Sequence, residues 1–205
     1  MTPGQERAID SGWPDYGLDV ATGEIDLGIV FGRCAPLTLE IGFGMGESLF
    51  QQAHENPDRD FVGIEVHRPG VGHLLMRIHE ADIANIRLYA EDSIDVLRNA
   101  IPERSLDVVQ LFFPDPWPKK RHHKRRIVNR DFVELVSSRL VSRGILHIAT
   151  DWEPYAADIE ILLSSREDLV QIEPPPRPRT KFEQRGERLG HRITDLAYRL
   201  AAEAH

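Results

Sequence analysis

The chain has 205 residues, of which 41% are hydrophobic and 28% charged, as in globular proteins and unlike disordered ones. No apolar run approaches the roughly 20 residues that span a bilayer, no signal peptide is recognisable, and the single cysteine, Cys34, excludes an internal disulfide or a cysteine-based metal site. We therefore expect one domain in the cytoplasm without membrane contact, and the net charge of −8 argues against a nonspecific binder of nucleic acid.

The first 35 residues show neither helical nor strand periodicity, and we interpret them as an irregular N-terminal arm ahead of a single domain, residues 36–205. In that domain, short apolar runs alternate with helical segments. The predicted strands are 37–41, 61–65, 86–90, 106–113 and 144–150. This alternation predicts a doubly wound α/β fold with a mostly parallel sheet and helices on both faces.

A glycine-rich loop follows the first predicted strand. Gly42, Gly44 and Gly46 lead into a helix, and the absence of side chains there lets the backbone turn and approach a ligand. The spacing differs from the dinucleotide fingerprint, because the third glycine of that motif would fall at Glu47. Glu40, within the strand, would repel a pyrophosphate and suit an amino group. The loop therefore predicts a site for a cationic ligand without phosphate.

Acidic residues also follow the next two strands. Glu65 ends the strand at 61–65, where an acid typically accepts hydrogen bonds from ribose hydroxyls. Asp92 has two interpretations, a contact to an adenine amino group or a cap for the helix that starts near Ser93. With Glu40, these acids lie at three successive strand ends. In this pattern the chain resembles the class I methyltransferases that use S-adenosylmethionine.

A strongly basic segment follows the strand at 106–113. That strand is apolar at nearly every position, as a central parallel strand requires, and Asp115 comes after it between two prolines. Residues 116–130, here called the first basic island, contain seven basic residues, two histidines and no acid. Such a run is ordinarily a solvated loop, but this one leaves a strand end beside the cofactor crevice, so it predicts a loop that binds a polyanion.

The C-terminal part contains a second basic segment and an ambiguous tail. Residues 177–192, the second basic island, contain six basic residues against two acids. In the tail, apolar residues recur at helical spacing, yet Leu196, Tyr198 and Leu200 also alternate as on a strand. Periodicity alone favours a helix there.

Five motifs carry a closer resemblance. They are LEIGFGMG (39–46), GIEVHRPGV (63–71), FPDPWPKKRHHKRR (113–126), TDWEPYA (150–156) and TKFEQRG (180–186). Together they resemble the bacterial tRNA (guanine-N7-)-methyltransferase family over nearly the whole domain. The resemblance implies a seven-stranded, Rossmann-like class I methyltransferase sheet whose last strand is antiparallel. On that ground we predict a strand, and not a helix, at 193–200.

The resemblance also implies the reaction, which is methyl transfer from S-adenosylmethionine, without a metal, to N7 of guanine 46 in the variable loop of tRNA. The predicted cofactor residues are the loop glycines Gly42, Gly44 and Gly46 and the acids Glu40, Glu65, Asp92 and Asp115. Asp115 is also the implied catalytic residue. The implied substrate residues are Lys119, Asp151, Thr180, Lys181, Phe182 and Glu183. We expect tRNA to lie on segments 116–130 and 177–192, and we expect no obligate protein partner.

Two other functions remain open from the sequence. A nucleic-acid-binding module could keep this fold without activity, although retention of all four acids speaks against it. A methyltransferase of small molecules would have no use for two basic islands.

Single residues also have structural alternatives, since Trp117 could stack on a base or pack its loop, and Asp151 could cap the helix near Glu153. His122 and His123 lack a partner at metal-ligand spacing.

Overall fold

The computed structural model describes residues 1–202 except 181–182, 184–185, 187 and 189. Its elements are α1 (Pro3–Tyr16), β1 (Gly17–Leu18), η1 (Val20–Thr22), α2 (Leu27–Phe31), β2 (Leu37–Ile41), α3 (Glu47–Glu55), β3 (Asp60–Ile64), α4 (Arg68–Ala81), β4 (Ile86–Tyr89), α5 (Ser93–Asn99), β5 (Leu106–Phe112), η2 (Lys120–Arg125), α6 (Arg130–Arg139), β6 (Leu140–Thr150), α7 (Glu153–Ser164), β7 (Leu169–Ile172) and β8 (Thr194–Leu200). Within the described residues no helix has the length and apolar character needed to cross a membrane.

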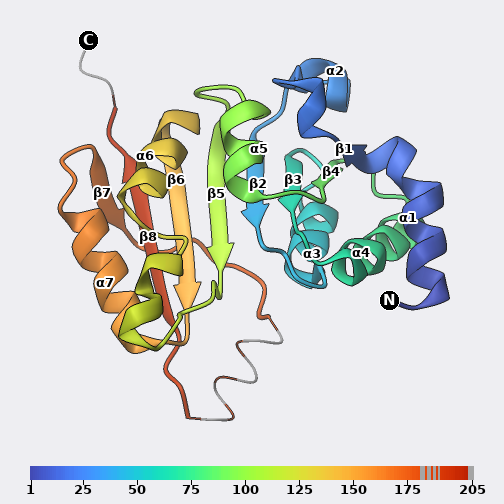
Figure 1. Cartoon of the computed structure of the whole chain (residues 1–205). Coiled ribbons are helices and arrows are strands. Elements are labelled where there is room, and N and C mark those ends of the chain that lie inside the picture. Colours follow the sequence, from blue (N-terminus) through green and yellow to red (C-terminus); the bar gives the residue numbers. More distant parts are fainter. Residues whose placement is uncertain (181–182, 184–185, 187, 189, 203–205) are drawn as a thin grey trace.

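The strands form one sheet in the order β1-β4-β3-β2-β5-β6-β8-β7 (Figure 1). Neighbouring strands from β1 to β6 pair in parallel, and β8 pairs antiparallel with both β6 and β7. The doubly wound fold and the antiparallel last strand are therefore confirmed. The described part has eight strands where we predicted seven, because the two-residue strand β1 is too short to show a period in the sequence.

The burial of strand β8 explains why the periodicity of its sequence was ambiguous. Leu196, Ala197 and Tyr198 in β8 are all buried, at 4%, 0% and 1% exposure. A strand inside a sheet with both faces covered reads as a continuous apolar run, so its residues satisfy a helical and an alternating pattern together.

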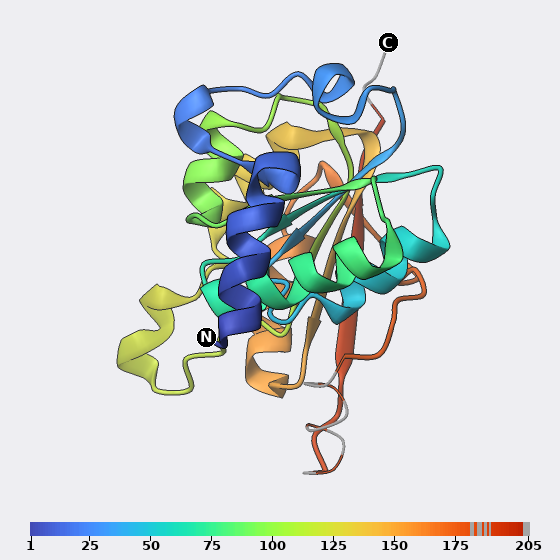
Figure 2. The same ribbon diagram turned by 90° about the vertical axis from the view of Figure 1, so that its right-hand side faces the viewer.

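The sheet has a hydrophobic core on each face. One core joins α5, α6 and α7 to the strands, and the other joins α1, α3 and α4. Figure 2 shows α1 lying across α4 on the outside of the second core. Both faces are thus covered by helices, as the sequence predicts for a parallel sheet.

The N-terminal 35 residues are ordered elements and not the irregular arm that we predicted. Helix α1 starts with a reciprocal cap, in which Thr2 N donates to Gln5 Oε1 (2.8 Å) and Gln5 N donates to Thr2 Oγ1 (3.3 Å). Glycines of α1 and α4 lie where the two helices are in close contact. A Cβ at Gly12 would lie 3.3 Å from Leu75, and one at Gly72 of α4 would lie 2.6 Å from the Gln5 carbonyl. When only a sequence is read, glycines at such helix contacts cannot be distinguished from glycines of a loop.

The connection between β7 and β8 brings distant chain to the functional edge of the sheet. These strands are antiparallel neighbours, so a two-residue turn would suffice to join them. Instead, residues 173–193 separate them. Of the described ones, Pro175 to Pro178 lie against the sheet beside Thr38 and Val108, and Thr180 and Arg188 lie with Gly42 and Glu65 at the carboxyl ends of β2 and β3. This segment contains the second basic island.

Candidate active site

The glycine loop between β2 and α3 requires its glycines. Gly42, Gly44 and Gly46 have φ values of 70°, 59° and 75°, a left-handed region that other residues adopt only with strain. Gly70, in the first turn of α4, packs against this loop, and a Cβ there would lie 1.9 Å from the Gly44 carbonyl oxygen. The sequence analysis missed Gly70, whose signal was its place in the GIEVHRPGV motif.

Glu40 is an acidic residue whose carboxyl group is buried. It lies in β2 at 3% exposure, and its Oε2 accepts a long hydrogen bond from Gln52 Nε2 (3.5 Å). Burial raises the pKa of Glu40 to about 8, although the Ser48 hydroxyl and the charge of Arg177 act in the opposite direction. A cation placed beside this carboxyl would relieve the cost of ionising it.

Glu65 connects the end of β3 to the glycine loop. Its Oε2 accepts a hydrogen bond from Gly44 N (2.8 Å), and its Oε1 accepts one from His67 N (2.8 Å). Each carboxylate oxygen can accept more than one hydrogen bond, so these contacts leave capacity for a ligand hydroxyl. Glu65 therefore orders the loop and remains able to contact a ligand.

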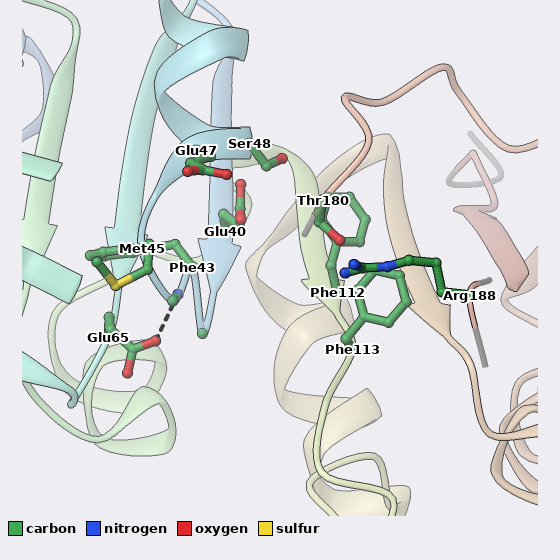
Figure 3. Close-up of a pocket in the computed structure, with 12 residues that line it drawn as sticks. Glu40, Phe43, Met45, Glu47, Ser48, Glu65, Phe112, Phe113, Thr180 and Arg188 are labelled. Carbon is green, nitrogen blue, oxygen red and sulfur yellow. Dashed lines mark hydrogen bonds between the residues drawn. The ribbon is translucent and has the colours of Figure 1, made fainter. Parts of the chain in front are cut away.

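These residues line a cavity of about 480 Å³ (Figure 3). The remaining wall comes from the end of β5 and from the second basic island. The lining residues are Glu40, Gly42, Phe43, Gly44, Met45, Glu47, Ser48, Glu65, Phe112, Phe113, Thr180 and Arg188. The cavity thus joins the predicted cofactor loop to one of the predicted substrate residues, Thr180, and its volume suits a small organic molecule.

Two predicted cofactor acids lie outside the wall of this cavity. Asp92 caps α5, where its Oδ1 accepts hydrogen bonds from Ile94 N (2.8 Å) and Asp95 N (3.4 Å). Asp115 is exposed in the loop after β5, two residues beyond Phe113. Phe113 and Trp117 flank it with φ values of 55° and 42°, and this left-handed backbone turns the loop sharply on both sides of Asp115.

Side chains within the first basic island pack against one another. Its 3-10 helix η2 follows the exposed Lys119. The guanidinium of Arg125 lies 4.9 Å from the centre of the Trp117 ring, and the His122 ring meets that ring edge-on at 5.9 Å. Trp117 therefore packs the loop, which was one of the two interpretations left open.

One basic residue of this island is buried and not available to a ligand. Arg126 is 7% exposed, and its Nε donates to the Pro116 carbonyl (2.8 Å). Its Nη1 donates to Asp158 in α7 (2.6 Å), and the guanidinium lies 4.4 Å from the centre of the Tyr155 ring. Arg126 thus fixes the basic loop to the body of the protein.

Of the predicted substrate residues, Asp151 contacts His191 of the second basic island, and Thr180 contacts Glu183. Asp151 Oδ2 accepts a hydrogen bond from His191 Nδ1 (3.1 Å). Asp151 does not cap α7, whose N-cap is Trp152 without a side-chain cap. Thr180 and Glu183 form a reciprocal turn, described below. Lys181 and Phe182 lie outside the described residues. In the described part of the chain, no group of three His, Cys, Asp or Glu side chains is placed to hold a metal ion.

Comparison with known proteins identifies the family. The model of a family described as "Putative methyltransferase" matches residues 34–196. A tRNA (guanine-N(7)-)-methyltransferase of Nitrosococcus oceani is 49% identical over 100% of this chain and 88% of its own length. A tRNA (guanine-N(7)-)-methyltransferase of Idiomarina loihiensis is 52% identical over 97% of this chain and 84% of its own. The chain belongs to the tRNA (guanine-N7-)-methyltransferase family.

Solved structures show how this family member folds relative to other methyltransferases. The 16S rRNA methyltransferase KamB superposes with a TM-score of 0.62 at 12% identity, over 83% of this chain and 90% of that one. A phosphoethanolamine N-methyltransferase of Haemonchus contortus superposes with a TM-score of 0.52 at 13% identity, over 84% and 50% of the two chains. The chain therefore has the class I, Rossmann-like methyltransferase fold.

Proposed function

We propose that the protein transfers a methyl group from S-adenosylmethionine to N7 of guanine 46 in the variable loop of tRNA, and that it does so in the cytoplasm. The observation that carries the proposal is identity of about 50%, over nearly the whole chain, to relatives named tRNA (guanine-N(7)-)-methyltransferase. Residues 36–205 would form the catalytic domain. The cavity supports the proposal, because the glycine loop forms one wall and residues of the second basic island form another.

The residues of the cavity fit this cofactor. S-adenosylmethionine, when bound, supplies a methyl group on a positively charged sulfur. Glu40 would bind the cationic amino group of the amino-acid part, since a cation beside this buried carboxyl would offset the cost of ionising it. Glu65 would accept hydrogen bonds from the ribose, Asp92 would contact the adenine amino group besides capping α5, and Gly42, Gly44 and Gly46 would let the backbone approach.

The chemistry needs alignment more than proton transfer. Guanine N7 carries a lone pair and no proton, so the new N7–carbon bond forms as the sulfur–carbon bond breaks, and no base is needed at the attacking atom. Positive charge passes from the sulfur to the purine. Asp115 would stabilise that charge through its carboxylate, or hold the base by accepting hydrogen bonds from N1–H and the amino group. Its position after β5, next to the cavity wall at Phe113, supports either role.

The remaining predicted residues would hold the RNA. Lys119 and the exposed basic residues of segment 116–130 would contact phosphates, as would the basic residues of segment 177–192 other than the buried Arg177. Asp151 and the run Thr180, Lys181, Phe182 and Glu183 would contact the target nucleotide. Exposing N7 of a stacked guanine costs a few kcal/mol, which these contacts must offset.

The proposal is tested by mapping the modified atom. An unmodified tRNA transcript with a variable-loop guanine is incubated with labelled S-adenosylmethionine, and 7-methylguanine is located by borohydride and aniline cleavage. We expect cleavage at that guanine and none in a transcript that carries adenine there. Absence of transfer while the protein still binds the cofactor, measured by calorimetry, would overturn the assignment of the substrate.

A further inference from the structure

Arg177 is the first residue of the second basic island, yet its side chain is only 6% exposed. Four of its hydrogen bonds are directed to oxygen atoms of the protein. Nε and Nη2 donate to the two carboxylate oxygens of Asp195 (2.7 and 2.8 Å), and Nη1 donates to Glu183 Oε2 (2.7 Å) and to the Pro178 carbonyl (3.3 Å). The residue is therefore committed to internal contacts and is not available to phosphate.

On one side, Arg177 is fixed to the sheet. Asp195 is the second residue of β8, and its Oδ1 also accepts a hydrogen bond from His147 Nε2 in β6 (2.8 Å). The His147 side chain is 1% exposed. Burial alone would raise the pKa of Asp195, but the hydrogen bonds from His147 and Arg177 outweigh it and hold that pKa at about 2. Asp195 is therefore ionised at neutral pH and provides a permanent anchor for the guanidinium.

On the other side, Arg177 meets the cavity wall. Glu183, which it binds, forms a reciprocal turn with Thr180, since Thr180 N donates to Glu183 Oε2 (3.3 Å) and Glu183 N donates to Thr180 Oγ1 (3.1 Å). Its guanidinium also lies 5.2 and 5.6 Å from the ring centres of Phe112 and Phe113. Thr180 and both rings line the cavity, and Thr180 lies beside the two rings in Figure 3.

We propose that Arg177 is a positioning residue that fixes the Thr180–Glu183 turn and the two phenylalanine rings to the ends of β6 and β8, and so sets the wall against which the methyl acceptor is held. The substrate side of this inference rests on the proposed function. The fork of the guanidinium is essential, because three nitrogens reach two carboxylates in fixed directions. A lysine ammonium keeps the charge but cannot span both carboxylates in that geometry.

The test compares Arg177→Met and Arg177→Lys with the matched control Arg166→Met. Arg166 forms a similar fork with Asp168 (2.8 and 2.5 Å), in the connection between α7 and β7. Three quantities are measured: exchange of the Thr180 and Glu183 amide protons by NMR, the dissociation constant for S-adenosylmethionine by calorimetry, and kcat and KM for the tRNA transcript.

We expect Arg177→Met to increase exchange of the two amides at least tenfold and to lower kcat/KM for tRNA by about 10- to 100-fold, because small misplacements of a reacting base are costly. The cofactor dissociation constant should rise by less than kcat/KM falls, because Arg177 acts on the cofactor residue Glu40 only through its charge, and Arg177→Lys should recover little activity. Arg166→Met should change none of these by more than about twofold. If Arg177→Met does not fold, Arg177→Lys carries the same expectations.

The positioning role is overturned if both amides keep wild-type exchange, or if kcat/KM stays within about threefold of wild type in a folded variant. A loss of cofactor affinity as large as the loss of kcat/KM would also overturn it, because it would show a general structural role. If the wild-type protein transfers no methyl group to tRNA, the proposed function fails. The amide exchange, which needs no RNA, then decides the positioning role by itself.

Discussion

Glu40 is an acid that the folded chain keeps protonated at neutral pH. Its folded pKa of about 8 lies above its ordinary value of 4.5, so between these values the folded state holds a proton that the unfolded chain has released. The free energy of unfolding therefore falls as pH rises from about 4.5 to about 8. Glu40, which we propose to bind the cofactor's cationic amino group, would thus lower the stability of the ligand-free protein at neutral pH.

Replacing Glu40 by glutamine should reverse this effect. We expect Glu40→Gln to raise the free energy of unfolding at pH 7 by roughly 1–3 kcal/mol, with a smaller gain at pH 5, because each pKa unit corresponds to about 1.4 kcal/mol. Urea unfolding at the two pH values measures the change in the free energy of unfolding, and Glu55→Gln, at an exposed position, is the control. Equal stability of wild type and Glu40→Gln at both pH values would contradict a raised pKa.

The same substitution should impair cofactor binding. Without the carboxylate, the cationic amino group would lose its partner, and we expect the dissociation constant for S-adenosylmethionine to rise at least tenfold. Calorimetry measures this on the same samples. A more stable protein that binds as tightly as wild type would remove Glu40 from the cofactor site.

Asp115 is exposed, so its replacement should affect the reaction and not the fold. We expect Asp115→Ala to keep the wild-type melting temperature within about 2 °C and to lower kcat about 100-fold or more, as loss of one electrostatic contact to a transition state typically does. Asp58→Ala, at an exposed turn before β3, is the control. Near-native turnover in Asp115→Ala would exclude a catalytic role.

At the scale of elements, Asp92 has a structural role that a conservative substitution can separate from ligand binding. Serine caps helices about as well as aspartate, so Asp92→Ser should change the free energy of unfolding by less than about 0.5 kcal/mol. It should still weaken cofactor binding severalfold, because the serine hydroxyl would not reach an adenine amino group. Thermal melts and calorimetry measure the two effects. Unchanged binding would leave Asp92 as a cap alone.

The basic loop contains residues of two kinds, and two substitutions should distinguish them. Arg126→Met removes the contacts to Pro116, Asp158 and the Tyr155 ring, and we expect it to destabilise the fold by roughly 1–3 kcal/mol. Lys124 is exposed, so Lys124→Gln should leave stability within about 0.5 kcal/mol. Urea unfolding measures both, and equal stabilities would show that Arg126 does not anchor the loop.

The elements that could be predicted from the sequence were those with one clear period. Strands β2 to β6 and the glycine loop follow from the alternation of apolar runs and helices. Helix α1 was missed because the glycines that allow its close contact with α4, such as Gly12, read as signs of a loop. Strand β8 was predicted only by resemblance, since a strand covered on both faces fits a helical pattern as well as an alternating one.

Across the whole molecule, positive charge is concentrated in the two basic islands, although the protein has a net charge of −8. If they bind tRNA phosphates, the logarithm of the association constant should fall with the logarithm of salt concentration by roughly 0.7–0.9 per contact. Replacing both Lys120 and Lys124 by glutamine should reduce that slope by about 1.4–1.8, as measured by filter binding. A slope that is unchanged would remove the two lysines from the RNA surface.

The islands also show what sequence could not predict about the site. The runs of charge predicted where polyanion-binding segments leave the sheet, but every arginine in such a run looks alike. Arg126 and Arg177 are buried over aromatic rings and paired with acids from distant parts of the chain. Only the packing of α7 and β8 against the islands separates anchors from exposed cations.

The insertion of β8 between β6 and β7 has a consequence for the order in which the protein is made. Because the ribosome releases the chain from its N-terminus, the glycine loop and the first six strands can form while β8 is still unsynthesised. Asp195, which holds Arg177 and through it the Thr180–Glu183 turn, arrives with that last strand. If Arg177 holds this wall as proposed, a nascent chain would complete its glycine loop before the wall, and methyl transfer would have to await synthesis of β8.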